Sequence, residues 1–110
     1  MGNYHPGEVV LLLFSFTDMR GAKRRPALVL LDTGDADVIV ARVTSQVIQT
    51  AFDVELMDWQ QAGLLLPSTT ARVHKLATLE KRLIERRLGK LTAGDWAQVR
   101  DKIHQLWSSL

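Results

Sequence analysis

The chain has 110 residues, 46% of them hydrophobic and 24% charged, with no cysteine and a formal net charge of +2. This length fits a single domain, and the composition excludes a disordered or collagen-like chain. The absence of cysteine excludes disulfides, thiolate metal sites and a cysteine nucleophile. The longest apolar run near the start, Val9 to Phe14, is too short to span a bilayer, so we expect a cytoplasmic protein without membrane contact.

The charge is distributed unevenly along the chain. Residues 1–71 hold five Lys and Arg against eight acidic residues, whereas residues 72–110 hold nine against four, which gives −3 and +5. Clustered basic residues concentrate polyanions, so RNA or DNA is a candidate partner. A solvated helix face would produce the same pattern.

The first third of the sequence predicts two strands joined by a loop. Residues 8–16 are almost continuously apolar, which favours a strand buried on both faces over an amphipathic helix. The polar segment 17–25 contains Gly21 and indicates a mobile loop. Pro26 then opens a second strand over 27–31, at a position where the missing N–H costs little.

The middle of the sequence predicts three more strands. Turn formers at 32–37 precede a strand rich in β-branched residues at 38–44. Residues 52–56 alternate apolar and acidic side chains, which is the period of a strand with one face in water. A further strand covers 68–76 after a turn at Pro67.

Two helices complete the prediction. Asp58 can cap a short helix that ends at Gly63. Thr92 and Asp95 resemble a capping box, with Asp in place of Glu, ahead of apolar residues at helical spacing. These residues form a stripe that we expect to bury against a sheet: Trp96, Val99, Ile103, Leu106 and Trp107. The whole pattern predicts a mainly β, α+β fold, namely a small antiparallel barrel with a short helix and a C-terminal helix.

Three blocks of the sequence resemble the PemK/MazF toxins in order and spacing. The blocks are Gly7-Glu8-Val9 in the first strand, Arg25-Pro26-Ala27-Leu28-Val29-Leu30 in the second and Val43-Thr44-Ser45-Gln46 in the third. The segment from Leu76 through the terminal helix is similar as well, so the resemblance covers nearly the whole chain. It implies one toxin domain over residues 1–110, a dimeric SH3-like barrel that cuts single-stranded RNA at short sequences and is inhibited by a cognate antitoxin.

The resemblance also implies site residues. The family's catalytic arginine and threonine fall on Arg25 and Thr44. One branch of the family uses an Arg-x-Asp pair, and here Arg72 carries the arginine while His74 replaces the acid. The segment 19–24 departs from the glycine-rich stretch of the best-known members.

RNA cleavage without a metal uses the neighbouring 2′-OH as nucleophile, so the protein must move protons and stabilise charge on phosphorus. Arg25, aided by Arg72, suits charge stabilisation because a guanidinium can grip two phosphate oxygens. Thr44 would orient the phosphate by a hydrogen bond. The alternatives are a surface arginine ahead of a strand and a threonine satisfied by nearby backbone.

Thr70, Arg72 and His74 share one face of an extended strand. His74 could shuttle a proton, or it could be a partly buried histidine bonded to backbone or to a carboxylate. Thr70 is also a candidate for RNA contact, and the other candidates come from the basic loop and the third-strand motif: Arg20, Lys23, Arg24, Ser45 and Gln46. No spacing suggests metal ligands, so we expect neither metal nor cofactor.

Two other functions stay open on sequence alone. A small barrel can be a non-catalytic module that binds RNA or an antitoxin, since a fold does not fix an activity. It can also be a poison of DNA gyrase, because toxins that act on gyrase share a similar barrel. Loss of growth arrest on replacing Arg25 or Thr44 would separate an enzyme from a binding module.

Overall fold

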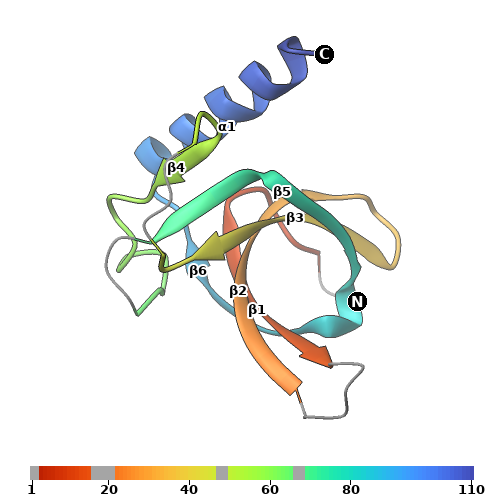
Figure 1. Ribbon diagram of the computed structural model, residues 1–110. Coiled ribbons are helices and arrows are strands. Elements are labelled where there is room, and N and C mark those ends of the chain that lie inside the picture. Colours follow the sequence, from red (N-terminus) through yellow and green to blue (C-terminus); the bar gives the residue numbers. More distant parts are fainter. Residues whose placement is uncertain (1–2, 16–21, 47–49, 66–68) are drawn as a thin grey trace.

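The computed structural model describes residues 3–15, 22–46, 50–65 and 69–110. Within these residues, six strands form one antiparallel sheet in the order β4-β5-β3-β2-β1-β6 (Figure 1). The strands are β1 (Glu8–Ser15), β2 (Ala22–Asp32), β3 (Asp37–Thr44), β4 (Asp53–Glu55), β5 (Thr70–Glu80) and β6 (Ile84–Lys90). A 3-10 turn, η1 (Lys81–Leu83), joins β5 to β6, and the helix α1 (Ala93–Ser108) follows.

The sheet curls strongly on itself, as an SH3-like barrel does (Figure 1). Among the described residues no ladder joins the edge strands β4 and β6, so the barrel is open along one side. The predicted mainly β fold with a C-terminal helix is confirmed. The open seam follows from β4, which is only three residues long and covers only the start of β5.

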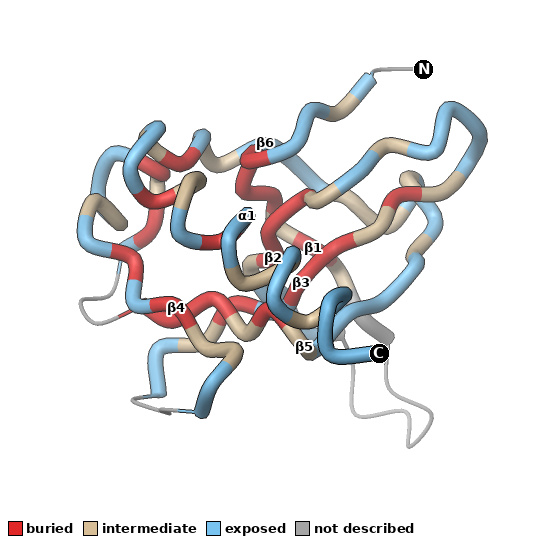
Figure 2. Tube along the Cα trace, turned by 90° about the horizontal axis from the view of Figure 1, so that it is seen from above, coloured by how far each residue is buried: buried red, intermediate tan, exposed pale blue. Residues whose placement is uncertain are grey.

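Buried side chains form two cores on opposite sides of the sheet. Val9 belongs to the first core, whereas its neighbours Val10 and Leu12 belong to the second, because successive strand residues point to opposite faces. The helix α1 adds Val99 to the first core and lies over that face (Figure 2). The prediction that the first strand is buried on both faces is therefore confirmed.

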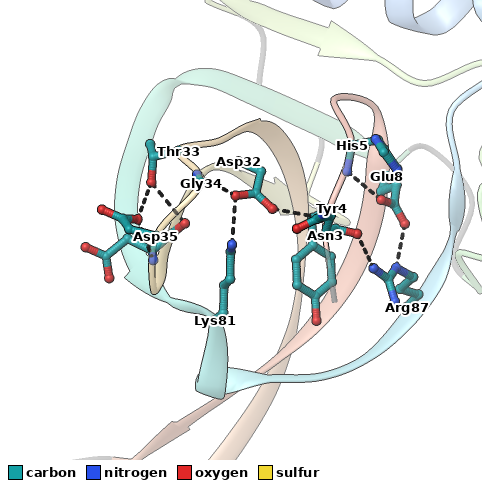
Figure 3. A network of polar contacts seen from close by, with 11 residues as sticks. Asn3, Tyr4, His5, Glu8, Asp32, Thr33, Gly34, Asp35, Lys81 and Arg87 are labelled. Atoms are coloured by element: carbon teal, nitrogen blue, oxygen red, sulfur yellow. Dashed lines mark hydrogen bonds and ion pairs between the residues drawn. The ribbon is translucent and has the colours of Figure 1, made fainter. Parts of the chain in front are cut away.

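A polar network fixes the residues that precede β1 (Figure 3). The Tyr4 amide donates to Asp32 (2.8 Å), whose other oxygen lies 2.7 Å from the Lys81 ammonium. The Tyr4 ring is covered by the Arg87 guanidinium, which lies 4.3 Å from the ring centroid. The same guanidinium donates to Glu8 (2.8 Å). These contacts tie the start of the chain to β2, η1 and β6.

The predicted loop at 17–25 is wrong at its C-terminal end. β2 begins at Ala22, and its first residues pair with β1 as far as Ser15 opposite Ala22. Backbone pairing with a long apolar strand outweighs the polar composition of this segment. Pro26 therefore lies inside β2, opposite Leu11, and the ladder to β3 begins one residue later, at Ala27. Residues 16–21 lie outside the described residues.

The short helix expected after Asp58 is instead a run of turns that ends at Gly63. The Asp58 side chain accepts a hydrogen bond from the Thr92 hydroxyl (2.8 Å) and so does not cap this segment. The turns pack directly on β6. A Cβ on Gly63, which has φ +81°, would lie 2.0 Å from the carbonyl oxygen of Leu88, so only glycine allows this approach.

The helix α1 begins as predicted but buries a shorter stripe. Thr92 is its N-cap and accepts from the Asp95 amide, at 3.4 Å. The Asp95 carboxylate does not complete a capping box and instead accepts from the amides of Met57 (3.1 Å) and Asp58 (2.9 Å). Trp107, expected to be buried, is 75% exposed because the C-terminal end of α1 runs beyond the sheet (Figure 1).

Candidate functional site

The central part of the candidate site lies on one face of neighbouring strands. Ala27 on β2 pairs with Arg42 on β3, and Arg25 and Thr44 lie two positions beyond this pair on their own strands. Thr44 in turn pairs with Thr70 on β5. Alternate residues of a strand share a face, so Arg25 and Thr44, the two residues expected to be the catalytic pair, extend the face on which Ala27 opposes Arg42.

The Thr44 hydroxyl occupies the end of β3, where the chain turns away from the sheet. Its oxygen accepts a hydrogen bond from the Gln46 amide (3.2 Å). Because a hydroxyl can accept and donate at once, this bond orients the oxygen and leaves its O–H to donate elsewhere. Ser45 and Gln46 are exposed beside it.

Arg25 and Thr44 line a groove of about 1050 Å³, together with Lys23, Ser45 and Gln46. We call it the basic groove. Five of its lining residues are cationic, namely Lys23, Arg25, Arg42, Lys75 and Arg86, and none of the described residues that line it is acidic. Such a surface attracts a polyanion, and its apolar floor includes Leu11, Leu76 and Leu79.

Three of these five cations did not stand out in the sequence. Arg42 and Thr44 are two positions apart on β3, so their side chains share a face. The alternation of side chains along a strand could have revealed this relation. Lys75 and Arg86 lie on β5 and β6. They join the groove only through the curl of the sheet, which no local pattern encodes.

Arg72 lies next to the groove, opposite Arg42 on β3 and opposite Asp53 on β4. Its Nε donates to Asp53 Oδ1 at 3.0 Å, and the two side chains are 14% and 2% exposed. Burial alone would raise the pKa of Asp53, but hydrogen bonds from Thr50 and Arg72 outweigh it and lower that pKa. Arg72 is thus paired with a carboxylate from the neighbouring strand.

His74 contacts Arg72 rather than the groove. Its Nε2 lies 3.3 Å from Arg72 Nη2, and its ring centroid is 6.1 Å from that of Phe52. Its Nδ1 is buried without a hydrogen-bond partner among the described residues. Whether His74 transfers a proton stays a prediction.

The remaining candidates are dispersed. Arg24 points away from the groove and forms an ion pair with Glu85 on β6 (2.6 Å), which lowers the pKa of that glutamate. Thr70 is buried on β5, and its neighbour Thr69 lines the groove. Arg20 lies outside the described residues.

Among the described residues, no three His, Asp or Glu side chains come together as metal ligands would. With 16 residues and several charges, α1 does not meet the requirements of a membrane-spanning helix, and the described part of the chain contains no other candidate. What the site offers chemically is therefore guanidinium, ammonium and hydroxyl groups facing a groove.

The sequence matches one known protein family over most of its length. Residues 5–107 match the family described as the PemK-like, MazF-like toxin of type II toxin-antitoxin systems. The chain belongs to this family. The resemblance that rests on the three sequence blocks is thereby confirmed, although no curated protein matches the sequence.

Solved structures of PemK/MazF toxins share the fold. The MazE–MazF structure (Form-III) from Deinococcus radiodurans is 26% identical, with a TM-score of 0.78 over 97% of this chain and 98% of that one. An endoribonuclease from mycobacterial species is 16% identical, with a TM-score of 0.75 over 98% and 94%. The Mycobacterium tuberculosis toxin MazF-mt6 is 20% identical, with a TM-score of 0.69 over 90% and 96%. At these lower identities the last two support the PemK/MazF fold alone.

Proposed function

We propose that this chain is a metal-independent endoribonuclease that cuts single-stranded RNA at selected sequences. The observation that carries the proposal is that Arg25 and Thr44 line the same groove, which has five cations in all and no acidic lining residue among those described. Related toxins of this family include proteins described as endoribonucleases, which supports the same activity here.

In the proposed reaction the 2′-OH of the preceding nucleotide loses its proton and attacks the phosphorus, and the P–O5′ bond breaks. The products are a 2′,3′-cyclic phosphate and a 5′-hydroxyl, whose oxygen takes up a proton as it leaves. Arg25 grips two phosphate oxygens and stabilises the charge that develops on them. Thr44 donates its hydroxyl to the same phosphate, and Arg72 adds a second guanidinium from β5. Lys23, Arg42, Lys75 and Arg86 hold the flanking phosphates, which gives affinity without sequence selection.

In the cell, the proposed enzyme is a cytoplasmic toxin that a cognate antitoxin inhibits. A mycobacterial relative has been solved with its cognate antitoxin, which supports a partner of that kind. A groove whose described lining residues include no carboxylate suits an acidic segment that folds on binding. We further propose that the active unit is a homodimer, which sedimentation at micromolar concentration tests directly.

The decisive experiment incubates the purified chain with a long single-stranded RNA in the presence of EDTA and maps the ends of the fragments. The wild type is expected to give discrete cuts with 5′-hydroxyl ends. Arg25→Ala and Thr44→Ala should each reduce the rate by about 10²–10³-fold, the cost of removing one group that stabilises transition-state charge. Arg100→Ala, an exposed arginine of α1 outside the groove, serves as control and should cut normally.

Three results would redirect the proposal. RNA that stays intact across diverse substrates, while still bound by the protein, would indicate a non-catalytic binding module. Cleavage that EDTA abolishes would indicate a metal-dependent nuclease. DNA damage without transcript cleavage in cells that express the chain would point to the gyrase poison.

A further inference from the structure

Arg72 is held on two sides by groups that do not face the basic groove. Its Nε donates to Asp53 on β4, and its Nη2 meets the Nε2 of His74, two residues further along β5. A guanidinium has five N–H donors, and these two contacts occupy two of them. Arg72 also pairs with Arg42, a lining residue of the groove, so its strand borders the path proposed for the RNA.

The Asp53 carboxylate is fully engaged. One oxygen accepts from Arg72 (3.0 Å), and the other accepts from the amide (2.9 Å) and the hydroxyl (2.7 Å) of Thr50. Its side chain is 2% exposed, so it cannot reach a substrate. An acid in this position can fix the orientation of Arg72 but cannot take a proton from RNA.

The contact with Arg72 also determines the state of the His74 ring. Arginine only donates hydrogen bonds, so the Nε2 atom that faces it must accept. The ring proton of this tautomer lies on Nδ1, which is the buried atom on the other side of the ring. Neither nitrogen then faces the groove, which argues for a role through Arg72 rather than in proton transfer.

We propose that Asp53 and His74 clamp the guanidinium of Arg72, so that its remaining N–H groups point at the phosphate of bound RNA. The proposal rests on the proposed function and assigns Asp53 as a positioning residue. In this arrangement Asp53, on the neighbouring strand, takes the place of the acid that a related branch carries two residues after the arginine. His74 is the second positioning residue.

The kinetic test of the clamp is a double-mutant cycle on the full chain. Asp53→Asn is expected to lower kcat by about 10–100-fold with little change in KM, because a displaced guanidinium loses transition-state contacts more than ground-state ones. In an Arg72→Ala background the same change should have no further effect. Glu80→Gln removes the carboxylate beside Arg82 in an exposed pair outside the groove and should leave kcat unchanged.

His74 gives a second test that does not depend on Asp53. The amide oxygen of glutamine can take the place of Nε2 but cannot shuttle a proton. His74→Gln should therefore keep most of the activity that His74→Ala loses. If both variants lose activity equally, His74 transfers a proton and its half of the clamp is wrong.

A measurement without RNA separates failure of the clamp from failure of the proposed function. The ¹⁵N chemical shifts of the His74 ring are expected to show the proton on Nδ1, whether or not the protein cuts RNA. A ring protonated on Nε2, or an Asp53→Asn effect that persists in Arg72→Ala, would overturn the clamp. If Asp53→Asn does not fold, the ring shifts together with His74→Gln and His74→Ala still decide the question.

Discussion

Asp32 shows how strongly the fold can lower the pKa of a single carboxylate. It accepts hydrogen bonds from the Lys81 ammonium and from the amides of Tyr4 and Gly34 (Figure 3). Each of these contacts favours the charged form, with Lys81 the largest contribution, so the pKa of Asp32 is lowered far below its ordinary value. The unfolded chain makes none of them.

The stability of the protein should therefore fall in acid. A carboxylate whose pKa is lower in the folded state stabilises that state above the unfolded value of about 4, and the stabilisation is lost as pH falls below it. We expect the free energy of unfolding to decline below about pH 4, less steeply in Asp32→Asn and to an intermediate degree in Lys81→Met. Urea unfolding at a series of pH values checks this, and equal slopes in all three proteins would contradict it.

At the scale of single residues, the sequence offered candidates for the chemistry but did not reveal the contacts that position side chains. Arg25 and Thr44 belong to motifs within single strands, and both line the basic groove. Asp53 lies 19 residues from Arg72, and Asp95 lies 38 residues from Met57. Such pairs depend on the order of the strands in the sheet and on how the helix packs, so they cannot be predicted from spacing in the sequence.

At the scale of elements, the turns that end at Gly63 pack so closely on strand β6 that the contact has no space for a side chain. The two segments meet backbone to backbone: a Cβ on Gly63 would lie 2.0 Å from Leu88 O, and one on Gly89 would lie 2.5 Å from the carbonyl group of Ala62. A side chain at either position would separate them. This contact closes the first core beside Leu64 and Leu91.

Gly63→Ala should destabilise the protein by about 2–4 kcal/mol, since it adds a left-handed backbone penalty to a backbone clash. For a chain of this size that corresponds to a decrease in Tm of roughly 8–16 °C, measurable by calorimetry. Gly34→Ala is the matched control, because Gly34 also has positive φ (+86°) but no atom within 4 Å. It should cost only about 1 kcal/mol, and an equal loss in both variants would refute the clash.

Elements with a clear period were predicted well and those without one were not. β1, β3 and α1 have apolar patterns that match their structure to within about one residue. β6, with the sequence IERRLGK, has no such pattern and becomes a strand because it pairs with β1. The turns after Asp58 were predicted as a helix because Asp and Gly mark the ends of helices and of turns alike.

At the scale of the whole molecule, the curl of the sheet concentrates positive charge in one groove although the net charge is small. The net charge of +2 would give weak attraction to RNA if it were spread evenly. The basic groove instead gathers cations from β2, β3, β5 and β6. Binding of a single strand there releases the counterions that its phosphates had condensed.

Affinity for RNA should therefore depend steeply on salt. With three to five phosphate contacts, the slope of log K against log salt concentration is expected to be about −2 to −3.5. Lys75→Ala and Arg86→Ala should each reduce its magnitude by about 0.7, whereas Arg100→Ala on α1 should not. Fluorescence anisotropy with an RNA that carries a 2′-deoxy cut site measures this, and identical slopes in all variants would place RNA outside the groove.

The helix α1 follows all six strands in chain order, so a ribosome completes it after them. Until α1 emerges, the first core lacks Val99, and the amides of Met57 and Asp58 lack the carboxylate of Asp95. Those amides lie just beyond β4, the strand that carries Asp53. The first core and the turns beside β4 are therefore complete only once α1 has docked.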